Sequence, residues 1–226
     1  MVNLLLSLNN FDENWCYNIL KNIIKEDYKV LIVPFSYDEK WLSNESDWSK
    51  AFNSKDGTHY EEIVSPFLAY GIDENNIKWI NQFTDTIDLM KEKIKDTDII
   101  FFTGGYPDKM MQRFKKYDLI NELENFKGIM IGTSAGAMVQ ISEFHITKDS
   151  DYKRYLYCKG LNIIKDFDIE VHFENKELQN LSILRCLKEK KKVVYSISND
   201  GAILVIDGQI YVLGDAEKWD IPKCYY

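Results

Sequence analysis

Short runs of apolar residues alternate along the chain with longer segments in which apolar side chains recur every three or four positions. The short runs are typical of buried strands, and the longer period is that of a helix with one buried face. Strands are predicted at residues 2–8, 28–35, 77–80, 98–103 and 128–132. Helices are predicted at residues 13–25, 59–70, 86–94, 107–117 and 135–141. Alternation of apolar strands with helices indicates a parallel sheet that is covered on both faces.

The pattern changes after residue 150, where strands outnumber helices. Strands are predicted at residues 163–173, 193–198, 202–206 and 209–213, with one helix at residues 176–189. Asp207-Gly208 between the last two strands is a strong hairpin signal. Residues 36–58 have no clear period and are predicted as loop or a short irregular helix. We therefore expect one α/β domain over residues 1–226, with an antiparallel extension at its C-terminal end.

Composition and charge narrow the range of partners. The chain has 226 residues, of which 45% are hydrophobic and 28% charged, as in ordinary globular proteins with a substantial core. Its formal net charge is −8, which argues against nucleic acid as the main partner, because phosphate binding needs a basic face. Arginine, the usual bidentate partner of a carboxylate, occurs only at Arg113, Arg154 and Arg185.

The cysteines and the absence of a membrane signal predict a cellular location. Cys16, Cys158, Cys186 and Cys224 have no metal-type spacing and are expected to be reduced thiols. The apolar run at residues 2–8 is too short for a signal sequence or a membrane span. The sequence therefore predicts a cytoplasmic protein that does not associate with a membrane.

The strongest chemical signal is the turn Gly132-Thr133-Ser134-Ala135-Gly136, which matches the pattern G-x-S-x-G. This pattern forms a nucleophile elbow when a strand precedes it and a helix follows it, and both are predicted here. The small flanking residues allow the strand to turn sharply with Ser134 at the apex. The alternative is a tight turn that merely buries a small serine.

A second glycine turn, Gly104-Gly105, follows the strand predicted at residues 98–103. By itself it indicates a turn that needs positive φ. Beside an activated serine, such a loop donates a second backbone N–H to the oxyanion. Because no Lys-Ser or Lys-Thr follows the glycines, a phosphate-binding loop is not expected.

A nucleophilic serine needs a base, and the chain has three histidines. His59 lies in a predicted helix, and His145 follows the helix after Ser134 with no predictable direction. His172 stands where a strand passes into a loop, a place where catalytic residues are often held. We therefore predict His172 as the base.

The motifs Thr103-Gly104-Gly105, GTSAGA at residues 132–137 and VHF-x-N at residues 171–175 together resemble peptidase family S51. This family contains the aspartyl dipeptidases (dipeptidase E) and the cyanophycinase-like serine peptidases. The resemblance implies a flavodoxin-like, class I glutamine amidotransferase-like three-layer sandwich. It also implies a cytoplasmic serine peptidase that acts on small peptides and needs no metal or cofactor; a homodimer is left open. Ser134 would be the nucleophile, His172 the base, and Gly105 and Ala135 the donors of the oxyanion hole.

The family resemblance also implies a third member of the triad. Relatives have an acidic residue before a glycine, shortly ahead of a late strand, and Asp200 before Gly201 fits that position. The predicted triad is therefore Ser134, His172 and Asp200. Asp149 is the rival for the acid, and Asp200 would otherwise only begin a turn.

Two departures from the family bear on specificity rather than on the hydrolytic residues. Relatives often have asparagine after the double glycine, where this chain has Tyr106 and Pro107. The aspartyl dipeptidases also carry an arginine-rich segment after the histidine motif, but residues 176–189 hold only Arg185. A preference for N-terminal aspartate is therefore not expected to follow from the resemblance.

Two other functions remain open at this point. An α/β-hydrolase esterase shares the elbow, but its acid precedes the histidine in the chain, which would require one of the aspartates at positions 149, 151, 166 and 168. A non-catalytic member of the same fold would keep the turn and bind a ligand without cleaving it. Because the chain has no HExxH motif or Cys/His cluster in sequence, no metal is expected in either case.

Overall fold

The computed structural model of the chain describes residues 1–54 and 56–220. The strands, in chain order, are β1 (Val2–Leu6), β2 (Val30–Val33), β3 (Ile77–Trp79), β4 (Ile99–Phe102), β5 (Ile129–Thr133), β6 (Glu143–Ile146), β7 (Leu156–Lys159), β8 (Phe167–Val171), β9 (Val193–Ile206) and β10 (Gln209–Trp219). The helices are α1 (Asn14–Leu20), α2 (Glu45–Phe52), α3 (Tyr60–Ala69), α4 (Ile87–Lys95), α5 (Pro107–Lys116), α6 (Ile120–Asn125), α7 (Ala135–Met138) and α8 (Glu177–Lys190), with the short 3-10 helix η1 (Glu74–Asn76) before β3.

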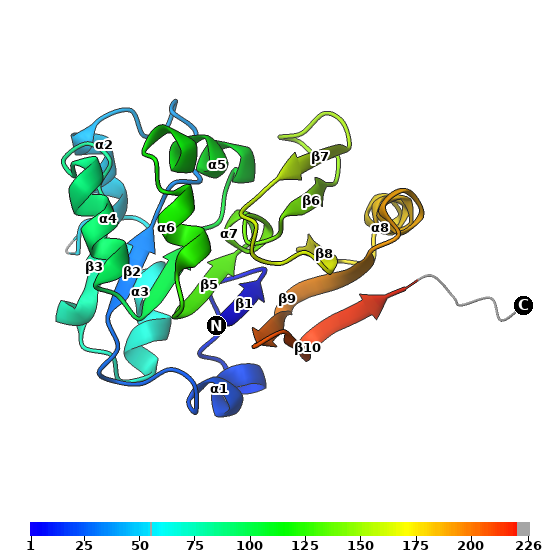
Figure 1. Ribbon diagram of the computed structural model, residues 1–226, viewed down its shortest axis with the longest axis horizontal. Helices are drawn as coiled ribbons and strands as arrows, with labels where there is room; N and C mark the ends of the chain where they lie inside the picture. Colours follow the sequence, from blue (N-terminus) through cyan, green and yellow to red (C-terminus); the bar gives the residue numbers. More distant parts are fainter. Residues whose placement is uncertain (55, 221–226) are drawn as a thin grey trace, which may run out of the picture.

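Most strands form one sheet in the order β10-β9-β1-β5-β4-β2-β3, and β8 pairs with part of β9 (Figure 1). The strands β1, β5, β4, β2 and β3 are parallel, whereas β9 runs antiparallel to both β1 and β10. A separate antiparallel pair is formed by β6 and β7. The predicted fold class, a three-layer α/β sandwich with a mostly parallel sheet and an antiparallel C-terminal extension, is confirmed.

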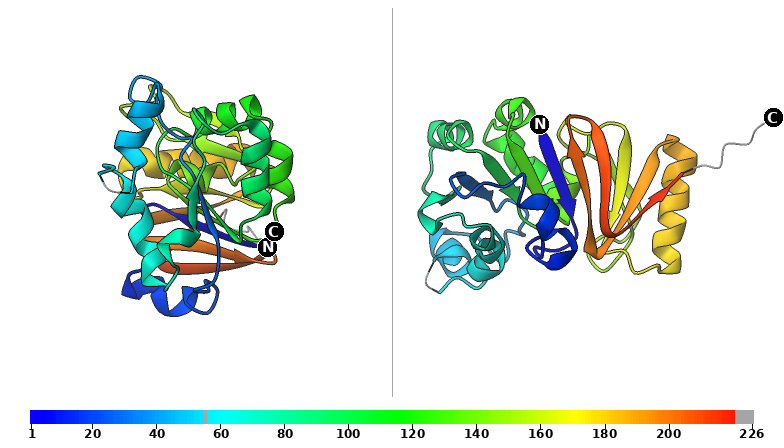
Figure 2. Two further views of the ribbon diagram at one scale, coloured as in Figure 1. Left: turned by 90° about the vertical axis from the view of Figure 1, so that its left-hand side faces the viewer. Right: turned by 90° about the horizontal axis from the view of Figure 1, so that it is seen from below.

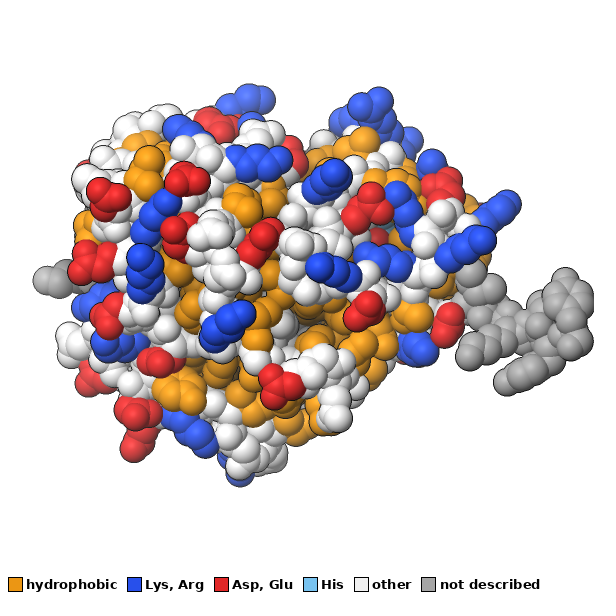
Figure 3. Space-filling view, in the orientation of Figure 1, with side chains coloured by type: hydrophobic (Ala, Val, Ile, Leu, Met, Phe, Trp, Pro, Cys, Tyr) orange, Lys and Arg blue, Asp and Glu red, His pale blue; other side chains and the backbone are white. Residues whose placement is uncertain are grey.

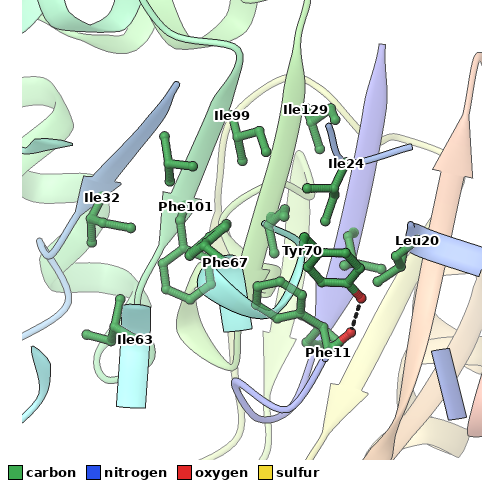
Figure 4. Packing of buried hydrophobic residues seen from close by; sticks show 14 of the residues in the cluster. Phe11, Leu20, Ile24, Ile32, Ile63, Phe67, Tyr70, Ile99, Phe101 and Ile129 are labelled. Carbon is green, nitrogen blue, oxygen red and sulfur yellow. Dashed lines mark hydrogen bonds between the residues drawn. The ribbon is translucent and has the colours of Figure 1, made fainter. Parts of the chain in front are cut away.

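Alternate residues of the central strands contact different helix layers, because successive side chains of a strand point to opposite faces. Leu4 and Phe101 pack with α1 and α3 on one face, where Phe11, Phe67 and Tyr70 form an aromatic cluster (Figure 4). On the other face, the alternate residues of β2 and β4 pack with α4, α5 and α6. Figure 2 shows the two helix layers on opposite sides of the sheet. Burial on both faces explains why β2 and β4 are apolar throughout.

The long strand β9 has two partners along one of its edges. Its first half, Val193 to Ile197, pairs in parallel with β8, and its second half, Ala202 to Ile206, pairs antiparallel with β1. β8 and β1 therefore run toward each other, and their carboxyl ends meet opposite residues 198–201. β5 lies beside β1 in the same direction, so its carboxyl end reaches the same region. The residues that follow β1, β5 and β8 thus converge at one junction.

The hairpin predicted at Asp207-Gly208 is confirmed. Both residues have positive φ, +48° and +84°, as a two-residue type I′ turn requires. The sequence predicted two strands before this turn, but β9 is continuous from Val193 to Ile206. It remains paired with β10 on both sides of an irregularity between Gly214 and Ala216, so the polar residues 198–201 do not end the strand.

Several short elements differ from the prediction. Residues 36–58 contain the regular helix α2, which begins after Asn44, whose side chain accepts a hydrogen bond from the Asp47 amide. The helix packs through Trp48 and Phe52 against Trp79 of β3. Because α2 has only eight residues and packs through aromatic contacts with a distant strand, its sequence shows no clear helical period. The pattern also failed to predict α6, β6 and β7, which have four to six residues each.

In the described part of the chain, no helix combines the length and the apolar character needed to cross a membrane. Cys16, Cys158 and Cys186 are free thiols, and Cys224 lies outside the described residues. Acidic and basic side chains are interspersed over the face seen in Figure 3, which carries no broad basic patch.

Candidate active site

Ser134 stands at the apex of the turn between β5 and α7. Its backbone has φ +50° and ψ −112°, a conformation that is strained for a residue with a side chain. The Ser134 amide donates a hydrogen bond to the Leu6 carbonyl of β1, at 2.8 Å. The neighbouring strand thus holds the strained turn in place.

The glycines of this turn are required by close packing. A Cβ atom at Gly132 would overlap the carbonyl group of Gly136, and one at Gly136 would overlap the carbonyl of Phe102 on β4. Only glycine allows the chain to fold back so tightly against the adjacent strand. The spacing of small residues noted in the sequence therefore reflects the geometry that presents Ser134.

The loop Gly104-Gly105 lies against Ser134. A Cβ atom at Gly104 would be 3.5 Å from the Ser134 Cβ, so the two loops are in contact. Gly105 has φ +134°, and the next amide, that of Tyr106, donates a hydrogen bond of 2.6 Å to the Ser36 carbonyl. The Ser36 hydroxyl also donates to the Gly104 carbonyl. Ser36, which follows β2, thus fixes this loop beside the serine.

The two predicted oxyanion donors keep their amides available. Among the described residues, neither the Gly105 N–H nor the Ala135 N–H has a hydrogen-bond partner within the protein. Gly105 and Ser134 both line the same hollows at the end of the sheet. An oxygen bound next to Ser134 would supply the acceptor that the Gly105 amide lacks.

His172 directly follows β8 and is held by contacts to its backbone. It has φ +50°, its amide donates to Ser7 Oγ at 2.9 Å, and its carbonyl accepts from Gln179 Nε2 at 2.9 Å. The Ser7 hydroxyl donates to the Ile197 carbonyl of β9, at 2.7 Å. Ser7 follows β1, so it joins the ends of the two strands that meet at β9 and sets the position of His172.

The structure places the candidate acids in different surroundings. The Asp200 carboxylate accepts a hydrogen bond of 2.9 Å from Asn10 Nδ2. The Asp149 carboxylate accepts from the amides of Asp151 and Tyr152 in its own loop. Among the described residues, Asn199 is the one whose side chain lies within hydrogen-bond distance of the imidazole, with its Oδ1 3.4 Å from His172 Nδ1. The role of Asp200 as the triad acid therefore stays a prediction, and Asn199 is a second candidate for the third position.

Two hollows flank the serine and share Gly105, Ser134 and His172 in their walls. The first hollow, of about 280 Å³, is also lined by Thr147, Tyr152, Glu170, Lys176 and Leu178. The second hollow, of about 360 Å³, is also lined by Asn9, Tyr37, Trp41, His59 and Glu62. Ser134 thus lies between two small hollows, and each hollow has room for one part of a small ligand.

A larger hollow, of about 570 Å³, opens at the opposite end of the sheet, where Asp98 and Gly128 precede β4 and β5. No serine, cysteine or histidine is among its described lining residues. Parallel sheets bind ligands beyond the carboxyl ends of their strands, which is the end that carries Ser134. We therefore take the two smaller hollows as the candidate active site.

A buried ionic cluster forms part of the wall of the first hollow. His145 Nδ1 lies 2.9 Å from Asp168 Oδ2, and its Nε2 lies 2.7 Å from Glu170 Oε2. The Cys186 thiol donates to Asp168, and the Thr147 hydroxyl donates to Glu170. The direction of the His145 side chain could not be predicted from the sequence, because only the pairing of β6 with β7 and the packing of β6 on β8 bring His145 to these carboxylates.

The protonation of this cluster follows from its contacts. Burial disfavours the charged imidazole, but Asp168 and Glu170 outweigh burial and raise the pKa of His145 well above its usual value of 6.5. Burial raises the pKa of the Cys186 thiol as well. His145, Asp168 and Cys186 are also the described group whose donor atoms approach closely enough for a metal ion. In the structure these atoms hydrogen-bond to one another.

This cluster predicts a pH-dependent stability. Because the pKa of His145 is raised by folding, its contribution is complete below about pH 6.5 and is lost as the pH rises through the folded-state pKa. We expect the free energy of unfolding to fall above about pH 6.5, and His145→Gln to lack this component. At about pH 6.5 the variant should be less stable by ~3–5 kcal/mol, since it leaves buried carboxylates unpaired. Urea unfolding at a series of pH values gives the free energy of unfolding of both proteins. If this free energy depended on pH equally in the wild type and in His145→Gln, the prediction would be refuted.

The chain is similar to a known protein family in sequence and to known proteins in structure. The model of the family described as peptidase family S51 matches residues 50–213. A candidate peptidase E protein from Listeria monocytogenes EGD-e has a similar structure, with a TM-score of 0.63 and 19% identity over 93% of this chain and 96% of that chain. A peptidase from an acI-B1 Actinobacterium is similar with a TM-score of 0.62 and 17% identity, over 98% and 95% of the two chains. At these identities the structures establish the shared fold. No curated protein matches the chain in sequence.

Proposed function

The chain belongs to peptidase family S51 and is thereby a serine-type peptidase, and we propose that it hydrolyses small peptides with Ser134 as nucleophile and His172 as general base. The observation that carries this proposal is the position of Ser134. It is held in a strained turn against the Gly104-Gly105 loop, and it shares the walls of two hollows with Gly105 and His172.

The proposed reaction is acyl transfer. His172 takes the proton from Ser134 Oγ as that oxygen attacks the amide carbonyl, and returns the proton to the leaving amine. The amides of Gly105 and Ala135 bind the oxyanion, and one such donor was worth about 3–4 kcal/mol in a comparable hydrolase. Water then hydrolyses the acyl-enzyme, with His172 again as the base.

The size and lining of the hollows support a small substrate without an acidic preference. Chambers of a few hundred Å³ are typical of sites for small molecules. No arginine is among the described residues that line either hollow. Arg113 of α5, the helix that follows the Gly104-Gly105 loop, is engaged by the Phe35 and Tyr37 carbonyls and by Glu39. The arginine clamp expected for N-terminal aspartate is thus missing from the proposed site.

The contacts of the acids weaken the esterase alternative. An α/β-hydrolase would use an aspartate before His172, and two of the four candidates have other partners: Asp168 is bound to His145 and Asp149 to its own loop. The three free cysteines fit the reducing conditions of the cytoplasm, which we keep as the proposed location. We also propose that no metal takes part in the reaction.

We expect the purified protein to react with a fluorophosphonate probe, because such probes modify only an activated serine. Mass spectrometry of the labelled peptides should place the probe on Ser134. A dipeptide library then gives the substrate preference, with cleavage of neutral dipeptides at least as fast as that of Asp-containing ones. A protein that neither reacts with the probe nor cleaves any dipeptide would instead be the non-catalytic binding member.

A further inference from the structure

We propose that Asn199, a neutral side chain, orients His172, so that the chain uses Ser134, His172 and Asn199 in place of a triad with a carboxylate. This inference rests on the proposed function of Ser134 and His172. It assigns the third position to a residue next to the one predicted from the sequence, Asp200. Asn199 acts through His172 and is therefore a positioning residue.

The path of β9 brings Asn199 to the imidazole. Residues 198–201 of β9 lie where the carboxyl ends of β1 and β8 meet, and His172 directly follows β8. The Ser7 hydroxyl ties this junction together through the His172 amide and the Ile197 carbonyl. The backbone on both sides of the contact is thus fixed. Asn199 Oδ1 then lies 3.4 Å from His172 Nδ1.

The same geometry turns Asp200 toward a different partner. Successive side chains of an extended strand point to opposite faces, so Asn199 and Asp200 cannot both face His172. The Asp200 carboxylate contacts Asn10, which precedes α1. A shift of one residue along β9 would exchange the two side chains, but pairing with β1 and β8 on one edge and β10 on the other fixes the register.

An amide oxygen can perform half of the task of a triad carboxylate. It accepts the Nδ1–H of His172, which selects the tautomer whose free Nε2 can take the proton from Ser134. Papain-like proteases use an asparagine in this way. The amide lacks the negative charge that stabilises the imidazolium formed in the reaction. Ser134 should therefore react more slowly in this protein than in a variant with aspartate at position 199.

Other charged groups face the same site and could mask the effect of Asn199. They are His145, Lys148, Asp149, Glu170 and Lys176 in the first hollow, His59 and Glu62 in the second, and Glu174 in the loop after His172. Glu174 is paired with Lys176, which lowers its pKa, with a smaller contribution from His172. Because these groups are unchanged in variants at position 199, a difference between such variants reports on that position alone.

The test measures the second-order rate of fluorophosphonate labelling of the full chain between about pH 6 and 10. We expect Asn199→Ala to lower the rate by about tenfold or more at every pH. Asn199→Asp should raise the maximal rate by about tenfold and move the acid limb of the profile to higher pH, since a carboxylate favours the protonated imidazole. Asp200→Asn, which keeps an acceptor for Asn10, should change the rate by less than about threefold.

The matched control is Asn162→Ala, which removes an exposed asparagine outside both hollows and should react like the wild type. Circular dichroism of each variant checks folding. An unchanged rate in Asn199→Ala, or a large loss in Asp200→Asn, would overturn the proposal and return the role to Asp200. An Asn199→Asp profile with an unmoved acid limb would also overturn it, because a residue with a structural role alone shifts no profile.

A second measurement does not depend on activity. Nitrogen-15 spectra of the imidazoles at high pH distinguish the two neutral tautomers, and the chain has only three histidines to assign. We expect His172 to carry its proton mainly on Nδ1 in the wild type and mainly on Nε2 in Asn199→Ala. If the wild type does not react with the probe but its His172 tautomer differs from that of Asn199→Ala in the expected way, the proposed function fails and the Asn199 contact stands. If the tautomer is the same in both proteins, the contact itself is refuted.

Discussion

Replacing Ser134 by alanine is expected to abolish peptide hydrolysis and fluorophosphonate labelling while leaving the fold intact. Removal of the nucleophile lowered kcat by about 10⁶-fold in a well-studied serine protease, and a loss of that size would leave only background here. The fold should tolerate the change because alanine lacks only the hydroxyl oxygen and meets the same backbone strain at φ +50°.

The measurement is kcat/KM for the best dipeptide of the library, with urea unfolding as the check on stability. Ser65→Ala is a matched control, because Ser65 is an exposed residue of α3 outside the two hollows. The control should retain full activity. Turnover by the Ser134→Ala protein above the background of a mock purification would remove Ser134 from the mechanism.

Replacing His172 by asparagine is expected to lower kcat by about 10⁴- to 10⁶-fold, comparable with loss of the base in other serine proteases. Asparagine is the suitable replacement because it tolerates positive φ better than other residues with side chains, and His172 has φ +50°. The backbone hydrogen bonds to Ser7 and from Gln179 can then persist. The variant should therefore lose its base without losing its loop.

Lys191→Asn serves as the control for this change, since Lys191 also has positive φ, +53°, and ends α8 away from the site. Steady-state kinetics of both variants should show a loss confined to His172→Asn, in kcat more than in KM. A His172→Asn enzyme that keeps more than about a tenth of the wild-type kcat would assign the base to another residue.

Much of the sheet could be predicted from the sequence because its strands are buried on both faces. Residues 99–102, for example, are all apolar, and a short apolar run between two helical segments is typical of a strand in a covered parallel sheet. The turn around Ser134 could be predicted for a similar reason. Gly132 and Gly136 are required because the backbone is crowded at this turn, and a requirement for glycine at two nearby positions can be recognised in the sequence.

Elements whose stability comes from distant contacts could not be predicted. The helix α2 depends on aromatic packing of Trp48 and Phe52 against Trp79, which belongs to the strand β3. His145 gave no sequence signal, because its partners Asp168 and Glu170 lie on β8 and meet it only across the packed strands.

The sequence by itself determined the family, the fold class and the identity of the residues proposed as nucleophile and base, since short motifs in a strand–turn–helix order carry that information. Only the tertiary structure decided which side chain meets the imidazole. Asn199 and Asp200 are adjacent in the sequence and equally polar, and composition cannot separate them. The register of β9 against β1, β8 and β10 turns Asn199 toward His172 and Asp200 toward Asn10, because alternate residues of a strand face opposite ways.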